Sequence, residues 1–164
     1  MEAGIERILS REAYHPEAYV EMNQLKIGVA DLSPGAGASF ITGCFARYLA
    51  NTGRHSPAVI ELGGSSLFDA FGMDKRFAGR TWFRFYETIE NSRGIRGKRN
   101  MDEGINWILK SPDETGIRLS FEEKLMLVSH ARGDVLFCDL SGEAEPDERL
   151  LRSMDQIIAV IDPM

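Results

Sequence analysis

A short apolar segment that runs into a glycine-rich loop and then a helical pattern is the strongest constraint on this fold. Residues 25–30 (LKIGVA) are apolar and partly β-branched, which predicts a buried strand. Residues 31–38 (DLSPGAGA) have the composition of a turn, and residues 39–50 repeat apolar side chains at helical spacing. Glycines let successive backbone N–H groups point into one concavity at the positive end of the following helix. The segment therefore predicts a phosphate site.

The same alternation of strands and helices continues along the chain. Further strands are predicted at residues 58–62, 105–109, 134–140 and 156–161, and helices at 121–133 and 148–154. Ser120 and Glu123 form the capping-box pattern that opens the first of these helices. The last two strands have almost no polar face, as expected for strands covered by helices on both sides. The pattern predicts a three-layer α/β fold with a mostly parallel sheet.

Length and composition favour one α/β domain, formed by residues 25–164, with a short helical lead-in at residues 1–24. The chain has 164 residues, of which 43% are apolar, and this is enough for one hydrophobic core. No apolar run is long enough to span a membrane, and the charged N-terminus does not resemble a secretory signal. We therefore expect a cytoplasmic protein in which Cys44 and Cys138, both in apolar segments, are buried free thiols.

Charge is distributed unevenly along the chain. The whole chain carries a net charge of −6, yet residues 75–99 contain eight basic and two acidic residues. Aromatic side chains are interleaved with these charges, at Phe77, Trp82, Phe83, Phe85 and Tyr86. Such a composition is typical of surfaces that contact nucleic acid or anionic lipid. It is also typical of a hydrophobic core with charges on its solvated face, so both interpretations of residues 75–99 stay open.

A second polar segment is expected at the same edge of the sheet as the glycine-rich loop. Asp139 ends the strand at 134–140 and precedes Gly142, which can approach a terminal phosphate. Ligands of parallel sheets lie beyond the carboxyl ends of the strands, and both segments are there. The predicted phosphate-binding residues are Gly35, Ala36, Gly37, Ala38, Ser39 and Gly142, and the predicted Mg²⁺ ligands are Ser39 and Asp139. We assign no catalytic residue.

Glu61 has two interpretations. It ends the strand at 58–62 and precedes Gly63 and Gly64. From this position a carboxylate can order a water molecule or a metal ion near a terminal phosphate. It can equally be an acid at a strand end that faces solvent. Because no partner for Glu61 can be identified in the sequence, we favour the second interpretation.

The loop and the three strand ends resemble the ParA/MinD class of P-loop ATPases, most closely pilus-localisation proteins of the TadZ/CpaE type. The resemblance rests on LKIGVADLSPGAGASFITG, VIELGG, VLFCDLSG and DQIIAVIDP, between Leu25 and Pro163. It implies a three-layer P-loop fold of the SIMIBI type that binds ATP and Mg²⁺. It also implies dimerisation across the nucleotide face and protein partners in a localisation or secretion system.

Two lysines of that class are replaced in this chain. The signature lysine of the loop falls at Ser33 and the phosphate-binding lysine at Ala38. Asp31 and Asp139 add negative charge, and the sequence indicates no lysine near them. Because phosphoryl transfer depends largely on electrostatic stabilisation, we expect a degenerate module with a regulatory or localisation role that binds ATP or phosphate weakly or not at all. The alternative is an active Mg²⁺-dependent ATPase whose positive charge comes from arginines in residues 75–99 or from a second subunit.

The resemblance also bears on the C-terminal end of the chain. Members of the class continue beyond the last predicted strand with further strands and a segment that recognises the base. We therefore expect either a chain truncated at its C-terminus or a protein with little means of selecting adenine. The replacement at Ser33 removes the lysine that reaches across the dimer in the class, which leaves open whether this chain dimerises.

Overall fold

One six-stranded sheet organises the part of the chain that the computed structural model describes, which comprises residues 24–64, 67–78, 100–114, 116–142 and 147–162. The strands are β1 (Leu25–Asp31), β2 (Pro57–Glu61), β3 (Met101–Asp102), β4 (Ile105–Ile108), β5 (Val135–Asp139) and β6 (Gln156–Val160). Their order in the sheet is β3-β4-β2-β5-β1-β6, and neighbours are parallel except for the β3–β4 hairpin. The predicted α/β fold with a mostly parallel sheet is confirmed.

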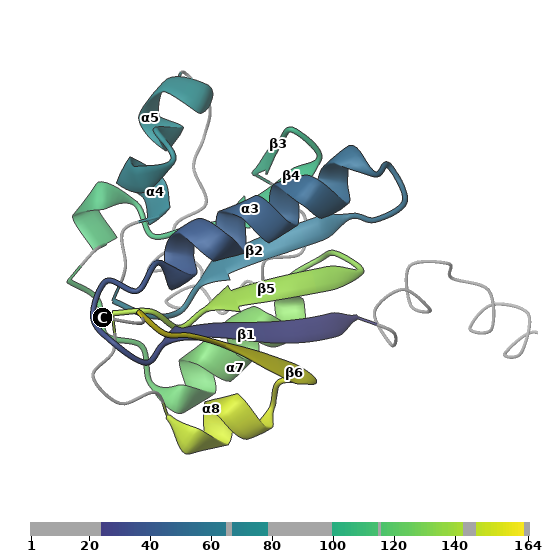
Figure 1. Cartoon of the computed structure of the whole chain (residues 1–164). Coiled ribbons are helices and arrows are strands. Elements are labelled where there is room, and N and C mark those ends of the chain that lie inside the picture. The colour runs from purple at the N-terminus through teal and green to yellow at the C-terminus, as the bar shows by residue number, and fades with distance from the viewer. Residues whose placement is uncertain (1–23, 65–66, 79–99, 115, 143–146, 163–164) are drawn as a thin grey trace, which may run out of the picture.

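Helices cover both faces of this sheet (Figure 1). The helices are α3 (Ala38–Asn51), α4 (Leu67–Ala70), α5 (Met73–Arg76), α7 (Phe121–His130) and α8 (Glu148–Arg152), and a 3₁₀ turn spans Pro112–Glu114. Successive strand residues point to opposite faces, so Val59 and Phe137 belong to the hydrophobic cluster beneath α3. Ile60 and Leu136 belong to the cluster that contains residues of α7 and α8. Two cores on the two faces of one sheet give three layers.

Local signals in the sequence set the start of α7 and the end of α3. The hydroxyl of Ser120 accepts a hydrogen bond from the N–H of Glu123 at 3.2 Å, and the Glu123 carboxylate accepts one from the N–H of Ser120 at 2.7 Å. This is the capping box that the sequence predicts. Gly53 comes after the last turn of α3 with a φ of 64°, a left-handed conformation that favours glycine.

The prediction that the last strand is covered on both sides is wrong. β6 lies at the edge of the sheet. Four of its five residues are exposed or half-buried, and Ile157 is 45% exposed. Its apolar sequence matches that of the central strand β5, in which every residue is buried. The position of a strand in the sheet order, which the sequence pattern does not encode, decides the difference.

The apolar spacing that predicts α3 lies mostly on its exposed side. Phe40 and Tyr48 are 69% and 68% exposed. The buried side instead carries small residues, namely Ala38, Thr42, Gly43 and Ala46. A Cβ atom at Gly43 would lie 2.1 Å from the ring of Phe71, so the helix approaches its neighbours through small side chains. A buried face made of small residues gives a weaker hydrophobic pattern in the sequence than the aromatic residues on the opposite face.

Two further predictions fall on residues outside the described part. The helical lead-in at residues 1–24 is outside it except for Gln24, whose side-chain amide donates to the carbonyls of Ala131 and Gly133. Most of the basic segment at residues 75–99 is outside it as well. Within the described ranges, none of the helices has the length and apolar character needed to cross a membrane.

Candidate phosphate-binding site

The loop between β1 and α3 is built on two glycines in left-handed conformations. Gly35 has a φ of 77° and Gly37, which precedes the first residue of α3, has a φ of 99°. The N–H groups of Gly37, Ser39 and Phe40 have no hydrogen-bond partner within the described part of the chain. These donors lie at the positive end of a 14-residue helix, an arrangement suited to an anion.

A carboxylate of the protein itself already binds one donor of this loop. Oδ1 of Asp31, the last residue of β1, accepts a hydrogen bond from the N–H of Ala38 at 2.9 Å. Asp31 therefore caps the start of α3 from the strand side and places a negative charge beside the glycine loop. An incoming phosphate would meet this charge as well as the free N–H groups.

Ser39 and Asp139 meet at the centre of the site. The hydroxyl of Ser39 donates to Oδ2 of Asp139 at 2.9 Å and lies 2.7 Å from the hydroxyl of Ser141. The N–H of Ser141 donates to Oδ1 of Asp139 at 3.0 Å, and Asp139 is fully buried. The structure brings the two predicted Mg²⁺ ligands together because β1 and β5 are parallel neighbours, so their carboxyl ends lie at the same edge.

Glu61 is fully buried, so the preferred interpretation that it faces solvent is wrong. Its Oε1 accepts from the N–H of Leu67 at 3.0 Å, and its Oε2 accepts from the N–H of Lys110 at 2.9 Å. The carboxylate thus joins the start of α4 to the segment after β4. These two backbone donors come from segments 6 and 49 residues away, which explains why no partner can be identified in the sequence.

Lys110 is a site residue that sequence reasoning missed. The sequence indicates no lysine near Asp31 and Asp139, whereas the buried Lys110 is connected to Asp139 through Gly63, whose N–H donates to the Asp139 carbonyl. It lies two residues beyond the end of β4, and its ammonium group donates a hydrogen bond to the carbonyl of Gly63. Its position just after the predicted strand at 105–109 could have indicated that Lys110 lies near the site, since parallel strands end at one edge of the sheet.

The segments after β2 and β5 touch through their backbones. The N–H of Gly63 donates to the carbonyl of Asp139 at 2.9 Å, and that of Gly64 donates to the carbonyl of Ser141 at 2.8 Å. A Cβ atom at Gly64 would lie 2.6 Å from the carbonyl oxygen of Gly142. Gly142, predicted to approach a phosphate, has a φ of 76° and packs against Gly64.

The glycine loop borders a pocket of about 300 Å³. Asp31 and Ser39 line it on the loop side, and the rings of Phe40 and Phe71 line it on the apolar side. The ring of Phe71 packs 5.4 Å from the ring of Trp107, and the guanidinium of Arg47 lies 5.5 Å from its centre. One wall of the pocket is therefore formed by aromatic rings, of which Phe71 is held by its neighbours, and the other wall is formed by the polar loop.

The residues at this edge fit a phosphate ligand that carries Mg²⁺. Mg²⁺ prefers oxygen ligands and is usually held by one or two carboxylates together with substrate phosphates. The Ser39 hydroxyl and the Asp139 carboxylate are such donors, while the N–H groups of Gly37 and Phe40 suit the phosphate. No group of three or more His, Cys, Asp or Glu side chains that could hold a metal occurs among the described residues.

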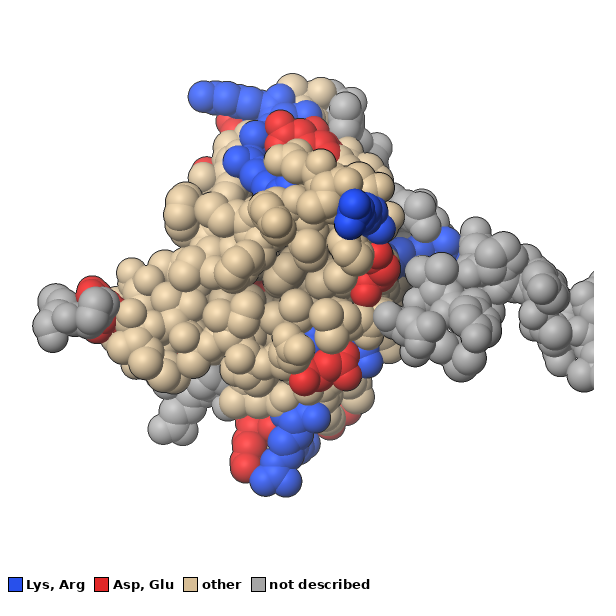
Figure 2. All heavy atoms as spheres, turned by 45° about the vertical axis from the view of Figure 1, so that its right-hand side comes forward, with Lys and Arg blue, Asp and Glu red and all other residues tan. Residues whose placement is uncertain are grey.

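Two described residues of the basic segment have defined environments. Arg76 donates to Asp102 at 2.7 Å and lies 3.0 Å from Glu103, and the bond to Asp102 raises the pKa of the guanidinium. Phe77 is 2% exposed and belongs to the core. On the face that Figure 2 shows, Lys and Arg lie beside Asp and Glu around a largely uncharged centre. Contact of the whole segment with an anionic partner stays a prediction.

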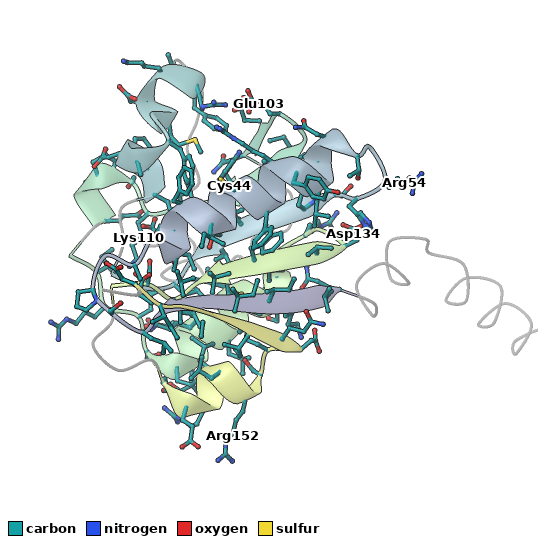
Figure 3. All side chains as sticks on the ribbon, viewed as in Figure 1. Cys44, Arg54, Glu103, Lys110, Asp134 and Arg152 are labelled. Carbon is teal, nitrogen blue, oxygen red and sulfur yellow. The ribbon has the colours of Figure 1, made fainter. Side chains whose placement is uncertain are left out.

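The two cysteines differ, and one prediction about them is wrong. Cys138 in β5 is buried, and burial raises the pKa of its thiol. Cys44, expected to be buried, is exposed and lies on the outer side of α3 (Figure 3). The reason is the orientation of α3, which packs on the sheet through its small residues.

The comparisons with known proteins identify the fold. The sequence matches no protein-family model and no curated protein. The structure matches a ParA-family ATPase from Chlorobium tepidum with a TM-score of 0.62 at 15% sequence identity, over 83% of this chain and 60% of that chain. The fold is that of the ParA-family ATPases.

Two other solved structures support the same fold. A plasmid partition protein from Borrelia burgdorferi bound to AMPPNP matches with a TM-score of 0.63 and 17% identity, over 84% of this chain and 61% of that chain. The VpsO kinase domain matches with a TM-score of 0.57 and 15% identity, over 93% of this chain and 76% of that chain. The chain thus spans about three fifths of the length of the Chlorobium and Borrelia structures.

Proposed function

We propose that this chain is a ParA/MinD-like regulatory or localisation module that binds a phosphate ligand, such as ATP with Mg²⁺, and hydrolyses it poorly. The contact between Ser39 and Asp139 carries the proposal. It places a hydroxyl and a buried carboxylate directly behind a glycine loop with free N–H groups, in a fold whose Borrelia example was solved with AMPPNP bound. The loop supplies hydrogen bonds and the Ser39–Asp139 pair supplies ligands for a metal.

Weak hydrolysis is expected from the charges around the loop. The segment from Leu32 to Ser39 contains no lysine or arginine, and Asp31 adds a negative charge to it. Transfer of a phosphoryl group spreads negative charge over the terminal phosphate oxygens and needs fixed positive charge close to them. Of the two described cations at 75–78, Arg76 is held by Asp102 and Glu103. If arginines of residues 75–99 provide positive charge to the site, they must be arginines other than Arg76.

Titration calorimetry tests the binding part of the proposal. The wild-type chain is titrated with ATP, ADP and inorganic phosphate, each with and without Mg²⁺. We expect binding of ATP that Mg²⁺ strengthens, and Asp139→Asn should remove the Mg²⁺ dependence. If none of the three ligands gives a binding heat at concentrations up to millimolar, the proposal is contradicted.

Single-turnover hydrolysis tests the enzymatic alternative. An excess of the chain is mixed with labelled ATP and Mg²⁺, and phosphate release is measured for the wild type, Ala38→Lys and Asp139→Asn. We expect slow release for the wild type and faster release for Ala38→Lys, because Ala38 lines the pocket beside the loop and a lysine there would add positive charge to the site. Rapid wild-type release that Asp139→Asn abolishes would instead establish an active Mg²⁺-dependent ATPase.

A further inference from the structure

Lys110 is buried in a place where its charge can act on the phosphate site. It is 5% exposed, and it and Lys124, which is 6% exposed, are the two buried lysines of the described ranges. Burial of an ammonium group is costly, so such a group is held by hydrogen bonds and by opposite charges. Lys110 lies at the carboxyl end of the sheet near the start of α3, whereas Arg54 and Asp134 lie at the opposite end (Figure 3).

A short series of contacts joins this ammonium group to the glycine loop. The Lys110 ammonium donates to the carbonyl of Gly63. The backbone of Gly63 touches that of Ser141, since a Cβ atom at position 63 would lie 2.1 Å from the Ser141 carbonyl oxygen. The hydroxyl of Ser141 is 2.7 Å from that of Ser39, on the first turn of α3. Lys110 is therefore connected, through Gly63 and Ser141, to the first turn of α3 beside the glycine loop.

Apart from Lys110, the described residues with charged side chains in this group are acidic. Asp31, Glu61 and Asp139 all have their carboxylates among these contacts, and the loop residues 32–37 carry no charge. A phosphate bound at the half-exposed loop adds further negative charge beside these buried carboxylates. The charge of a buried cation such as Lys110 is screened by solvent less than that of an exposed one. A cation fixed in that region lowers the free energy of the bound state.

We propose that Lys110 supplies the positive charge that holds a phosphate ligand at the loop from Gly35 to Ser39, acting from behind Gly63. This inference rests on the proposed function of the site. It assigns the cation to the segment after β4, outside the loop itself. The hydrogen bond to the Gly63 carbonyl fixes the ammonium group, and Glu61 fixes the backbone of Lys110.

The test compares substitutions of the two buried lysines. Lys110→Met removes the charge and keeps most of the volume, and Lys124→Met makes the same change on α7. Affinities for inorganic phosphate and for Mg²⁺-ATP are measured by calorimetry, with urea unfolding of each variant. We expect Lys110→Met to weaken both affinities at least tenfold and Lys124→Met to change them less than twofold. Lys110→Arg should retain more of the affinity than Lys110→Met.

A lysine placed in the loop separates a charge effect from a structural one. If Lys110 acts by its charge, adding Ala38→Lys to Lys110→Met should restore the affinity, because Ala38 is the first residue of α3. If Ala38→Lys does not restore the affinity in a double variant whose urea unfolding matches that of Lys110→Met, Lys110 only positions Gly63 and the inference is overturned.

A measurement on the wild-type chain covers the case in which Lys110→Met does not fold. With ¹³C at the lysine ε-carbon, the Lys110 signal, assigned by Lys110→Arg, should shift on saturation with phosphate while that of Lys124 stays in place. An unmoved Lys110 signal, or equal affinities of the two methionine variants, overturns the inference and leaves the proposed function standing. Absence of any phosphate binding by the wild type overturns both.

Discussion

The hydroxyl of Ser39 donates a hydrogen bond to Oδ2 of Asp139 at 2.9 Å, although the two residues are 100 positions apart in the sequence. The bond joins the first turn of α3 to the end of β5. Because the other carboxylate oxygen of Asp139 accepts from the N–H of Ser141, the whole acidic group is held in one orientation. Such fixed oxygen donors suit a metal that demands regular geometry, as Mg²⁺ does.

The charge of Asp139 should determine the Mg²⁺ dependence of ligand binding. Asp139→Asn keeps the shape and removes the charge, so we expect ATP affinity in the presence of Mg²⁺ to fall about tenfold, ~1.4 kcal/mol. Affinity without Mg²⁺ should stay equal or rise, because a repulsive charge is lost. Calorimetry at two Mg²⁺ concentrations gives both values. Asp74→Asn, at an exposed residue of α5, is the control, and equal Mg²⁺ effects in the two variants would contradict the prediction.

Removal of the Asp31 charge should strengthen phosphate binding. An asparagine at this position can still accept from the N–H of Ala38, so Asp31→Asn preserves the cap on α3 while its repulsion of an anion disappears. We expect inorganic phosphate to bind several-fold more tightly, by about 1 kcal/mol. The gain should shrink as ionic strength rises, because salt screens a half-exposed charge. An unchanged or weaker affinity at low salt would show that the Asp31 charge does not oppose the ligand.

The local elements were predictable from the sequence, whereas the environment of single side chains was not. β1, its glycine loop and α3 can be read from apolar spacing and glycine chemistry, and the meeting of Ser39 with Asp139 from parallel strands ending at one edge. Glu61 is buried where the N–H groups of Leu67 and Lys110, 6 and 49 residues away, bind its carboxylate, and periodicity contains no information on such pairs. Ile157 is exposed because β6 is an edge strand, and the order of strands in a sheet has no local signature.

A side chain at position 63 should be costly, because two backbones touch there. The Cβ of Gly63→Ala would lie 2.1 Å from the Ser141 carbonyl oxygen, and a backbone atom cannot move aside as a flexible side chain can. We expect the free energy of unfolding to fall by about 1–3 kcal/mol, the usual range for overpacking. Urea unfolding measures it, with the slope checked for constancy. Gly116→Ala is the control, since no atom lies within 4 Å of its Cβ, and equal losses in both variants would count against the contact.

The two thiols should differ sharply in reactivity. The thiolate is the reactive form of cysteine, and burial raises the pKa of Cys138, which keeps this thiol protonated and also out of reach of reagents. Cys44 lies exposed on α3. At pH 8 we expect a maleimide to label one thiol per native chain within minutes and two per chain in urea, as read by intact mass.

Cys44→Ser and Cys138→Ser identify the labelled residue. The native Cys44→Ser variant should take up no label, and native Cys138→Ser should react as fast as the wild type, because the modified thiol is on the surface of α3. Raising the pH from 7 to 9 should leave Cys138 unmodified, since the raised pKa of Cys138 keeps its thiolate scarce over this range. Native labelling of Cys138 at a rate that matches Cys44 would show that β5 opens readily or is not covered on both faces.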